Sequence, residues 1–246
     1  MDHFYNVVSP HLDDVALSCS LFLAANPGSR IITVFDGAPA SVSPLPPWDA
    51  GSGIFSDGAD VSAVRRAEDV RAAALVKAST VHLGYWDSQY RNEDYGYQGP
   101  PDDDLAGVIA EDLARRLGQD PWPLVIPLGL CHSDHRTTAE ACLILAGRRS
   151  GDTYLYEDLP YSAEYHDAVA DQKAALAGRG LALEEYATIG SPDTRPLKLA
   201  VIMCHASQRR PLGRQRVRTA VRTPERIWRL VPDKHPAPES MAGGHG

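Results

Sequence analysis

The sequence predicts an α/β fold, a Rossmann-like and mostly parallel sheet with helices on both faces and an active site at the carboxyl ends of the strands. Two observations predict it. Apolar runs of strand length recur along the chain, and segments with the spacing of an amphipathic helix lie between them. With 246 residues, 43% of them hydrophobic, the chain can bury a substantial core as one domain. We expect that domain to span residues 1–234 and a flexible tail to follow over residues 235–246.

Five apolar runs are predicted to be strands. They cover residues 4–9, 30–35, 80–85, 123–128 and 153–158. Short apolar runs bounded by turn residues are typical of strands buried in a parallel sheet.

Three segments between these runs carry apolar residues at helical spacing. Residues 15–26 place Val15, Ser18, Cys19, Phe22 and Leu23 on one face, residues 61–78 place Val61, Val64, Val70 and Leu75 there, and residues 104–117 place Leu105, Val108, Ile109, Leu113 and Leu117 there. We expect these three faces to pack against the sheet.

Two long polar segments interrupt the alternation of strands and helices. Residues 37–60 are rich in Gly, Pro and Ser, and residues 87–104 contain three tyrosines among polar residues. Structureless connections of this length are uncommon in compact domains unless they are functional. We therefore expect both loops to lie beside the strand ends. Tyrosines in a polar loop suit a sugar-like ligand, although packing against the domain explains any one of them as well.

Charge and composition narrow the class of protein. The formal net charge is −8, which gives no support for nonspecific binding of nucleic acid. The Arg-rich segment 209–222 is interpreted as a solvated face, with a polyanion site as the alternative. The four cysteines form no CxxC pair, no signal peptide precedes the first strand, and no apolar run reaches the roughly 20 residues of a membrane span. We expect a soluble cytoplasmic enzyme that binds neither membrane nor nucleic acid.

The stretch PHLDDVALS, residues 10–18, places three ionisable groups where the first predicted strand meets the first predicted helix. Asp13 or Asp14 could cap that helix by accepting hydrogen bonds from its first N–H groups. Capping explains neither His11 nor the doubled acid, because adjacent carboxylates repel each other unless a cation or several donors offset them. A metal site is the second interpretation.

A matching cluster follows the fourth predicted strand, where HSDH places His132, Asp134 and His135 at another strand-to-helix junction. In the common doubly wound arrangement the first and fourth strands are neighbours at the ligand-binding edge. His11, Asp14 and His135 would then provide two imidazoles and a carboxylate, a set suited to a catalytic zinc with an open coordination position. Asp13 and His132 would remain as acid–base groups for metal-assisted hydrolysis.

Three other classes of protein fit these residues less well than a hydrolase does. A dinucleotide-binding domain should carry GxGxxG at its first junction, but PHLDD stands there. A metal-dependent phosphoesterase would in many cases hold two metals, and we find ligands for one. A binding or regulatory protein could keep the fold without turnover, but all five reacting residues are present.

These residues resemble the PIG-L family of zinc-dependent N-acetylglucosaminyl deacetylases, also called LmbE-like proteins. The family signature is a strand followed by (P/A)HPDD and a distant HPDH or HxDH, which PHLDD and HSDH match except at Leu12 and Ser133. Residues 65–69 (RRAED), 83–88 (LGYWDS) and 198–208 (KLAVIMCHASQ) are similar to further family segments.

The resemblance implies roles for individual residues. It implies that His11, Asp14 and His135 bind one Zn²⁺ or another divalent ion, that Asp13 is the general base on the water at the metal, and that His132 stabilises the oxyanion while Asp134 orients it. It suggests Asp87 for sugar hydroxyls and Arg65 or Arg66 for a polar aglycone, although ion pairing with Glu68 or Asp69 explains either arginine. Glu157 and Asp158 could orient a ligand or cap a helix.

The function that the resemblance implies is removal of an N-acetyl or N-acyl group from an amino sugar in a small-molecule glycoside, within bacterial secondary metabolism such as antibiotic biosynthesis. The alternative is a deacetylase or amidase acting on a thiol-cofactor precursor or conjugate. The expected partner is the small-molecule substrate, and a homo-oligomer is possible. The acyl group, the aglycone and the effect of Leu12 stay open.

Overall fold

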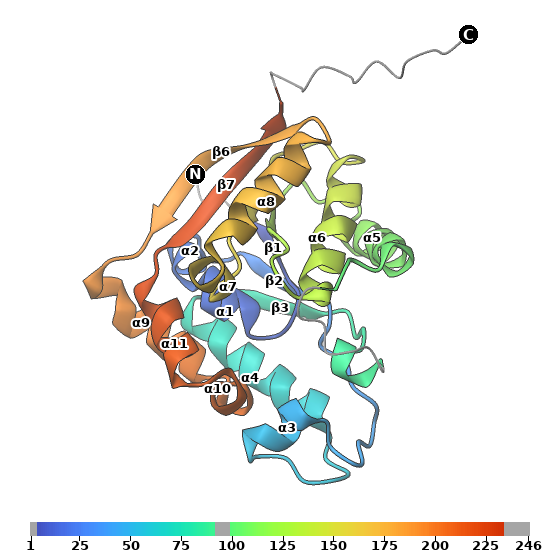
Figure 1. Cartoon of the computed structure of the whole chain (residues 1–246), viewed down its shortest axis with the longest axis vertical. Coiled ribbons are helices and arrows are strands. Elements are labelled where there is room, and N and C mark those ends of the chain that lie inside the picture. The colour runs from blue at the N-terminus through green and yellow to red at the C-terminus, as the bar shows by residue number, and fades with distance from the viewer. Residues whose placement is uncertain (1–3, 92–98, 234–246) are drawn as a thin grey trace.

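The computed structural model describes residues 4–91 and 99–233, and it contains one seven-stranded sheet with the order β3-β2-β1-β4-β5-β7-β6 (Figure 1). The parallel strands are β1 (Asn6–Ser9), β2 (Arg30–Thr33), β3 (Ser79–His82), β4 (Leu124–Pro127) and β5 (Thr153–Tyr156). All five predicted strands and the mostly parallel sheet are confirmed. The predicted tail lies outside the described residues, and the domain boundary stays a prediction.

Two antiparallel strands extend the sheet beyond the prediction. These strands are β6 (Leu181–Ile189) and β7 (Glu225–Pro232), and β7 pairs with both β5 and β6. β6 is the outer strand, and many of its side chains, including Glu184 and Glu185, are exposed. An edge strand buries too little apolar surface to give the sequence pattern of a central strand.

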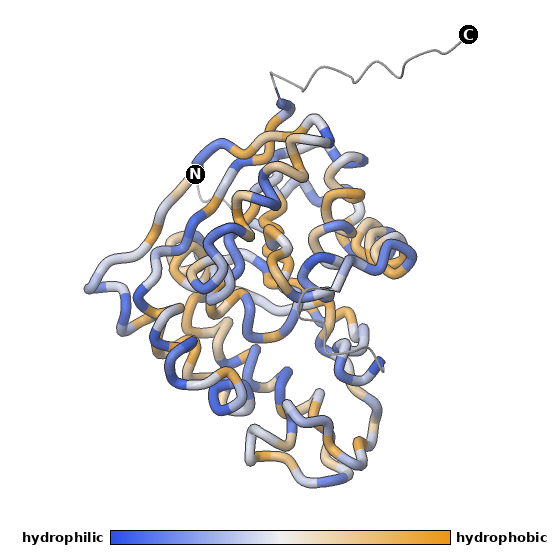
Figure 2. Tube along the Cα trace, viewed as in Figure 1, coloured by the Kyte–Doolittle hydropathy of each residue, from blue (hydrophilic) through white to orange (hydrophobic). Residues whose placement is uncertain are grey.

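Helices cover both faces of the sheet. One face carries α1 (Asp14–Ser18), α2 (Ser20–Ala25), α4 (Val61–Leu75) and α9 (Arg195–Met203), and the other carries α5 (Asp103–Leu117), α6 (Ser133–Ala146) and α8 (His166–Ala177). Successive strand residues point to opposite faces, so Val7 packs with the first group and Val8 with the second. In Figure 2, α5 alternates between hydrophilic and hydrophobic residues, as a helix with one buried face does.

The apolar face predicted for α4 is confirmed at Val61, which is fully buried, and wrong at its other three residues. Val64, Val70 and Leu75 are 39%, 51% and 48% exposed, whereas Arg65, Glu68 and Asp69 are buried. Only the second half of the helix, through Ala72 and Ala73, packs in the core of its sheet face. The three buried charged residues instead bind Asp49, Ser207 and His82, which lie on other elements. In α5, Val108 is likewise exposed, while Leu105, Ile109, Leu113 and Leu117 pack in the core as predicted.

The remaining helices surround the carboxyl ends of the parallel strands. They are α3 (Pro47–Ser52), η1 (Ser88–Tyr90), α7 (Tyr161–Glu164), η2 (Pro192–Thr194), α10 (Ala206–Leu212) and α11 (Arg214–Arg222). α3 lies within the first predicted loop and packs against α10. In the second predicted loop, Tyr95 and Tyr97 lie outside the described residues.

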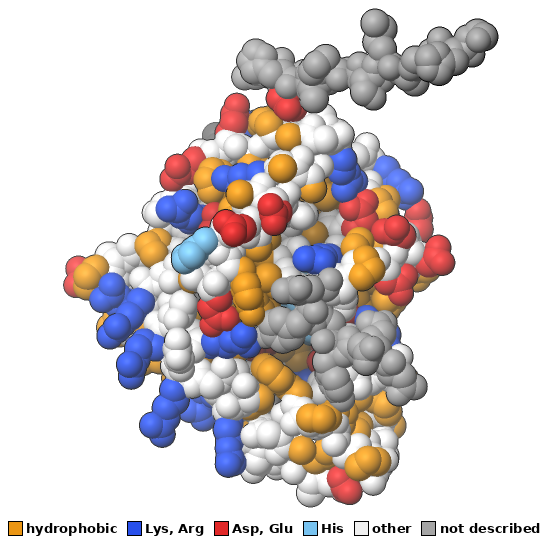
Figure 3. All heavy atoms as spheres, viewed as in Figure 1, with side chains coloured by type: hydrophobic (Ala, Val, Ile, Leu, Met, Phe, Trp, Pro, Cys, Tyr) orange, Lys and Arg blue, Asp and Glu red, His pale blue; other side chains and the backbone are white. Residues whose placement is uncertain are grey.

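The Arg-rich segment 209–222 forms α10 and α11. Figure 3 shows Lys and Arg side chains gathered along the edge of the molecule where α9, α10 and α11 lie. Arg214, Arg218 and Arg222 are exposed, and Arg216 pairs with Glu164 of α7. Among the described residues, no helix is both long enough and apolar enough to cross a membrane.

Candidate active site

The turn between β1 and α1 is held by a hydrogen bond between the Asp14 carboxylate and the backbone three residues earlier in the chain. The Asp14 carboxylate accepts a hydrogen bond from the backbone N–H of His11 at 2.8 Å, and Ser9 Oγ accepts one from the N–H of Val15 at 3.3 Å. Asp13 occupies the N-cap position of α1, but its side chain makes no capping hydrogen bond. Helix capping therefore does not explain the paired acids.

The junction after β4 needs unusual backbone conformations. Gly129 has φ +85°, and a Cβ on it would lie 2.7 Å from Ala139 Cβ, so only glycine fits there. Cys131 also has a positive φ, of 64°, which is strained for a residue with a side chain. The turn brings His132 to the N-cap of α6, where its Nδ1 accepts a hydrogen bond from the backbone N–H of Asp134 at 3.1 Å. In neutral His132 the proton must then be on Nε2.

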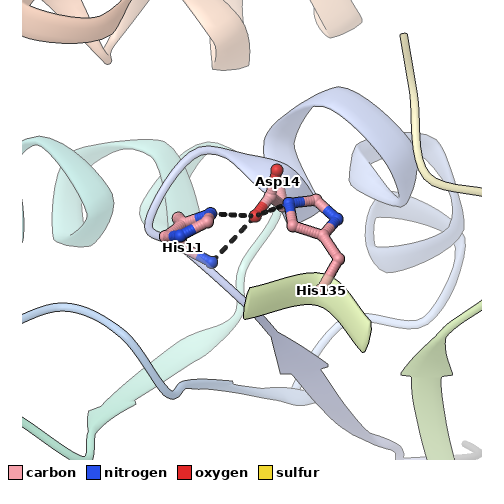
Figure 4. A group of neighbouring side chains, drawn as sticks. All are labelled: His11, Asp14 and His135. Carbon is pink, nitrogen blue, oxygen red and sulfur yellow. Dashed lines mark hydrogen bonds and ion pairs between the residues drawn. The ribbon is translucent and has the colours of Figure 1, made fainter. Parts of the chain in front are cut away.

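His11, Asp14 and His135 converge as the sequence predicted, because β1 and β4 are neighbours (Figure 4). Asp14 Oδ2 lies 3.1 Å from His11 Nδ1 and 3.1 Å from His135 Nε2. His135 Nε2 is buried and makes no hydrogen bond of acceptable geometry within the described part of the chain. One ligand atom from each residue lies within 4.8 Å of the others. Two imidazoles and a carboxylate at this spacing, with an unsatisfied ring nitrogen among them, fit a divalent metal ion.

Asp158 fixes the orientation of His135. It is 1% exposed, follows β5, and its Oδ1 accepts a hydrogen bond from His135 Nδ1 at 2.6 Å. Its Oδ2 accepts hydrogen bonds from the N–H groups of Gly129 at 3.0 Å and Leu130 at 3.3 Å. A metal-binding histidine commonly donates its second ring N–H to such a carboxylate. Of the two interpretations of Asp158 from sequence, orientation of a ligand is the one that the structure supports.

Asp134 holds His11 and not His132. Its carboxylate lies 2.9 Å from His11 Nε2, and it accepts hydrogen bonds from Arg91 Nη2 at 2.6 Å and from the N–H of Ser88 at 3.1 Å. The expected orientation of His132 by this carboxylate is therefore replaced by a contact with the Asp134 backbone. Nothing in the spacing of HSDH distinguishes the two partners.

The three residues of the metal group have strongly shifted pKa values. Burial by itself lowers the pKa of His11, but hydrogen bonds to Asp134 and Asp14 raise it well above its ordinary value. Burial also opposes protonation of His135, yet Asp14 and Asp158 raise its pKa to about 9. Burial acts to raise the pKa of Asp14, but His135 and His11 hold it far below its usual range. A divalent cation must compete with protons for this group.

The pKa of Asp13 is raised above its ordinary value, and the pKa of His132 is lowered below its ordinary value. Burial and the charge of Asp14 raise the pKa of Asp13 to about 7, which is close to the ideal for a general base at neutral pH. Burial and the charges of His11 and His135 lower the pKa of His132 to about 4. His132 is therefore neutral at pH 7, and its ring proton lies on Nε2.

These groups open into a cavity of about 330 Å³. Its polar wall includes His11, Asp13, Asp14, Arg65, Asp87 and His132. Its apolar wall includes Leu12, Leu17, Phe35, Pro47, Trp48 and Leu212. Trp48 is held by a 2.7 Å hydrogen bond from its Nε1 to Gln208 Oε1, which joins residues 160 positions apart. Sequence spacing gives no signal for such a contact.

The residues predicted to bind substrate separate into two groups. Asp87 and Arg65 line the cavity, and Arg65 is also bonded to the buried Asp49 of α3. Arg66 does not line the cavity, because its Nε binds the buried Asp36 at 2.5 Å. The pairing of either arginine with Glu68 or Asp69, which the sequence left open, does not form.

The fold and site define a class of metal-binding α/β proteins, and residues 6–146 match the model of the family described as PIG-L, GlcNAc-PI de-N-acetylase. The chain belongs to this family. It is 31% identical over 185 residues to the 2′-N-acetylparomamine deacetylase of Streptomyces fradiae, a match that covers 71% of this chain and 63% of that protein. The chain therefore matches less than two thirds of the length of this relative.

Solved structures give the same architecture over most of the chain. The A40926 pseudoaglycone deacetylase Dbv21 is 26% identical with a TM-score of 0.76, over 97% of this chain and 100% of that one. The zinc-inhibited form of the teicoplanin deacetylase Orf2 is 24% identical with a TM-score of 0.77, over 94% and 98% respectively. The latter likeness shows the fold alone.

Proposed function

We propose that this protein is a zinc-dependent hydrolase that removes an N-acetyl or N-acyl group from an amino sugar in a small-molecule glycoside. The observation that carries the proposal is the convergence of His11, Asp14 and His135 beside a carboxylate, Asp13, whose pKa is raised to about 7. Family membership and the deacetylase relatives support the type of reaction, and those relatives support a place in antibiotic biosynthesis.

His11, Asp14 and His135 would hold the metal. Nitrogen and carboxylate ligands favour zinc among the common divalent ions, although another divalent ion would fit the same donors. When bound, the ion would supply a Lewis acid for the acyl carbonyl and would lower the pKa of a water at the site toward about 7. Asp158 and Asp134 would fix the two imidazoles at the angles needed for binding.

Asp13 and His132 would carry the proton and charge movements. Asp13 removes a proton from the attacking water as its oxygen bonds to the acyl carbon. The Nε2–H of neutral His132 donates a hydrogen bond to the carbonyl oxygen as negative charge develops there. When the C–N bond breaks, Asp13 returns the proton to the leaving nitrogen, which departs as an amine.

The walls of the cavity suit an amphiphilic glycoside. Asp87 would accept hydrogen bonds from sugar hydroxyls, and Arg65 borders the same wall. The aromatic face of Trp48 and the side chain of Leu212 form an apolar surface for the aglycone or the acyl group. Arg66 has no place in this proposal, because it lies outside the cavity.

A phosphoesterase activity fits the site less well, whereas an amidase activity fits it equally. A two-metal phosphoesterase would need a second independent ligand set, but the second candidate group, His11, His132 and Asp134, shares His11 with the first. The Asp134 carboxylate is also already bonded to Arg91. An amidase of a thiol-cofactor precursor would use the same chemistry, and it differs only in what occupies the apolar wall.

We further propose a cytoplasmic location, consistent with four free cysteines.

A screen for release of free amine from N-acetylglucosaminyl glycosides, detected by mass, tests the function. Metal analysis is the parallel measurement, with about one zinc per chain expected in the wild type and little in His11→Ala. Arg66→Ala is the matched control and should keep both metal and turnover. A wild-type protein that contains no metal and still binds a glycoside would refute the hydrolase and favour a ligand-binding protein.

A further inference from the structure

His205 is a buried histidine for which the proposed reaction has no role. It stands at the N-terminal end of α10, it is 2% exposed, and neither Nδ1 nor Nε2 makes a hydrogen bond to another residue that the structure describes. Burying a polar ring without a partner costs free energy, so an imidazole in this position is expected to meet ordered water. The space around the ring shows where such water can lie.

Two small cavities flank His205, each of about 10 Å³, which is close to the minimum that holds one water molecule. The first lies among α1, α2, α4 and α9, and its acidic residue is Asp69. The second lies between α1 and α10, and Asp13 and Arg209 line it. His205 is the only residue besides Ala16 that borders both cavities in the described part of the chain.

The second cavity brings together groups that can satisfy a buried water. Arg209 Nε is buried and donates no hydrogen bond to residues 4–91 or 99–233. The Gln208 side chain is already bonded to Trp48 and Ser207, so it is less available. One guanidinium donor, one carboxylate acceptor from Asp13 and one ring nitrogen are the three partners that a buried water typically has.

The geometry points to an ordered water that bridges His205 and Asp13, which makes His205 a positioning residue for the proposed base. The water accepts a hydrogen bond from Arg209 Nε–H, and it donates one to the Asp13 carboxylate and one to a ring nitrogen. The other ring nitrogen then carries the proton and donates to a second water beside Asp69. Asp69 itself is held by His82 at 2.8 Å.

The bridge fixes the direction of the Asp13 carboxylate, because that carboxylate makes no capping hydrogen bond to α1. A general base must keep one oxygen within hydrogen-bond reach of the proton that it removes. Loss of the bridge should therefore slow the chemical step and leave substrate binding intact. The catalytic part of the inference rests on the proposed function, whereas the presence of the water does not.

A crystal structure of the wild type at a resolution that shows ordered water tests the bridge directly. We expect one water in each cavity, and empty cavities would overturn the inference. His205→Leu nearly conserves volume and removes both ring nitrogens, so the water beside Asp13 should disappear and the carboxylate should turn. His205→Gln keeps a donor and an acceptor and should keep that water. If His205→Leu does not fold, the wild-type and His205→Gln structures still decide the question.

Kinetics tests the consequence for catalysis. In His205→Leu, kcat should fall roughly 10- to 100-fold, the usual range for removal of an outer-shell partner, with KM unchanged. His205→Gln should restore most of the loss. Cys204→Ala is the matched control, because Cys204 is the adjacent residue but borders neither cavity, and it should keep wild-type kcat. Wild-type kcat in His205→Leu would refute the positioning role. If the wild type turns over no glycoside, the proposed function fails, but the waters and the Asp13 orientation still decide the bridge.

Discussion

Replacing Asp158 by asparagine tests how the fold prepares His135 for a metal. The Asp158 carboxylate serves three donors, namely His135 Nδ1 and the backbone N–H groups of Gly129 and Leu130. Asparagine has one acceptor oxygen and an NH₂ group, so it cannot accept hydrogen bonds both from His135 and from the backbone N–H groups. Neither orientation of its amide reproduces the native contacts.

The two orientations fail for different reasons. With the oxygen toward His135, the NH₂ group faces two backbone donors, and the unsatisfied contacts cost about 1–3 kcal/mol of the free energy of unfolding. With the oxygen toward the backbone, the NH₂ group donates to His135 Nδ1. The ring proton then moves to Nε2, the nitrogen that faces Asp14, and that nitrogen cannot bind a metal. We expect metal affinity to fall roughly 10- to 100-fold, which is about 1.4–2.8 kcal/mol.

Competition with a chromogenic chelator at fixed pH measures this change as a metal Kd, and thermal unfolding of the metal-free protein measures the stability cost. Asp152→Asn is the matched control, since the Asp152 side chain is 46% exposed and bonds to the surface residue Arg229 and the nearby Tyr154. Its metal Kd should equal that of the wild type. A metal Kd of Asp158→Asn indistinguishable from wild type would refute the orienting role.

Three further predictions concern pH, the base and the arginines. Because the pKa of His135 is raised from 6.5 to about 9, its protonation stabilises the metal-free fold fully below pH 6.5. That stabilisation is lost as the pH rises toward 9, while metal affinity, measured in the same buffers, increases over this range. Asp13→Asn should keep one metal per chain by elemental analysis and lose about 10²- to 10⁴-fold in kcat, and full activity would exclude Asp13 as the base. Arg66→Ala should lower the free energy of unfolding by about 1–2 kcal/mol, because buried Asp36 loses its charged partner, yet leave KM unchanged. Arg65→Ala should raise KM, and the opposite pattern for the two arginines would contradict the cavity assignment.

Much of the fold could be predicted because central strands have a strong local signal. Four of the five parallel strands, β1, β2, β4 and β5, are short and mostly buried, so each could be recognised from its own residues, and β3 at the edge of the sheet is partly exposed. The face of α4 could not be predicted this way. Its Arg65, Glu68 and Asp69 are buried because partners from three other elements neutralise or bond them, whereas Val64 and Val70 face solvent. Apolar periodicity assumes that charged residues face solvent, and that assumption fails where other elements supply buried bonding partners.

The contacts of the candidate site could likewise be predicted from the sequence only in part. The sequence predicted that His11, Asp14 and His135 would meet, because both clusters follow strands that are adjacent in a doubly wound sheet. It did not predict that Asp134 binds His11, a contact across 123 positions. Nor did it predict that Trp48 and Leu212 would share one wall of the cavity.

By itself, the sequence determined the chemical types at the site and the order in which strands present them, because strand-to-helix junctions are local features with local patterns. Only the tertiary structure decided what each polar group faces. It bonded Asp134 to His11 and Asp158 to His135. It also left His205 buried beside two water-sized spaces. The physical reason is that the partner and the pKa of a buried group depend on distances between segments far apart in the chain.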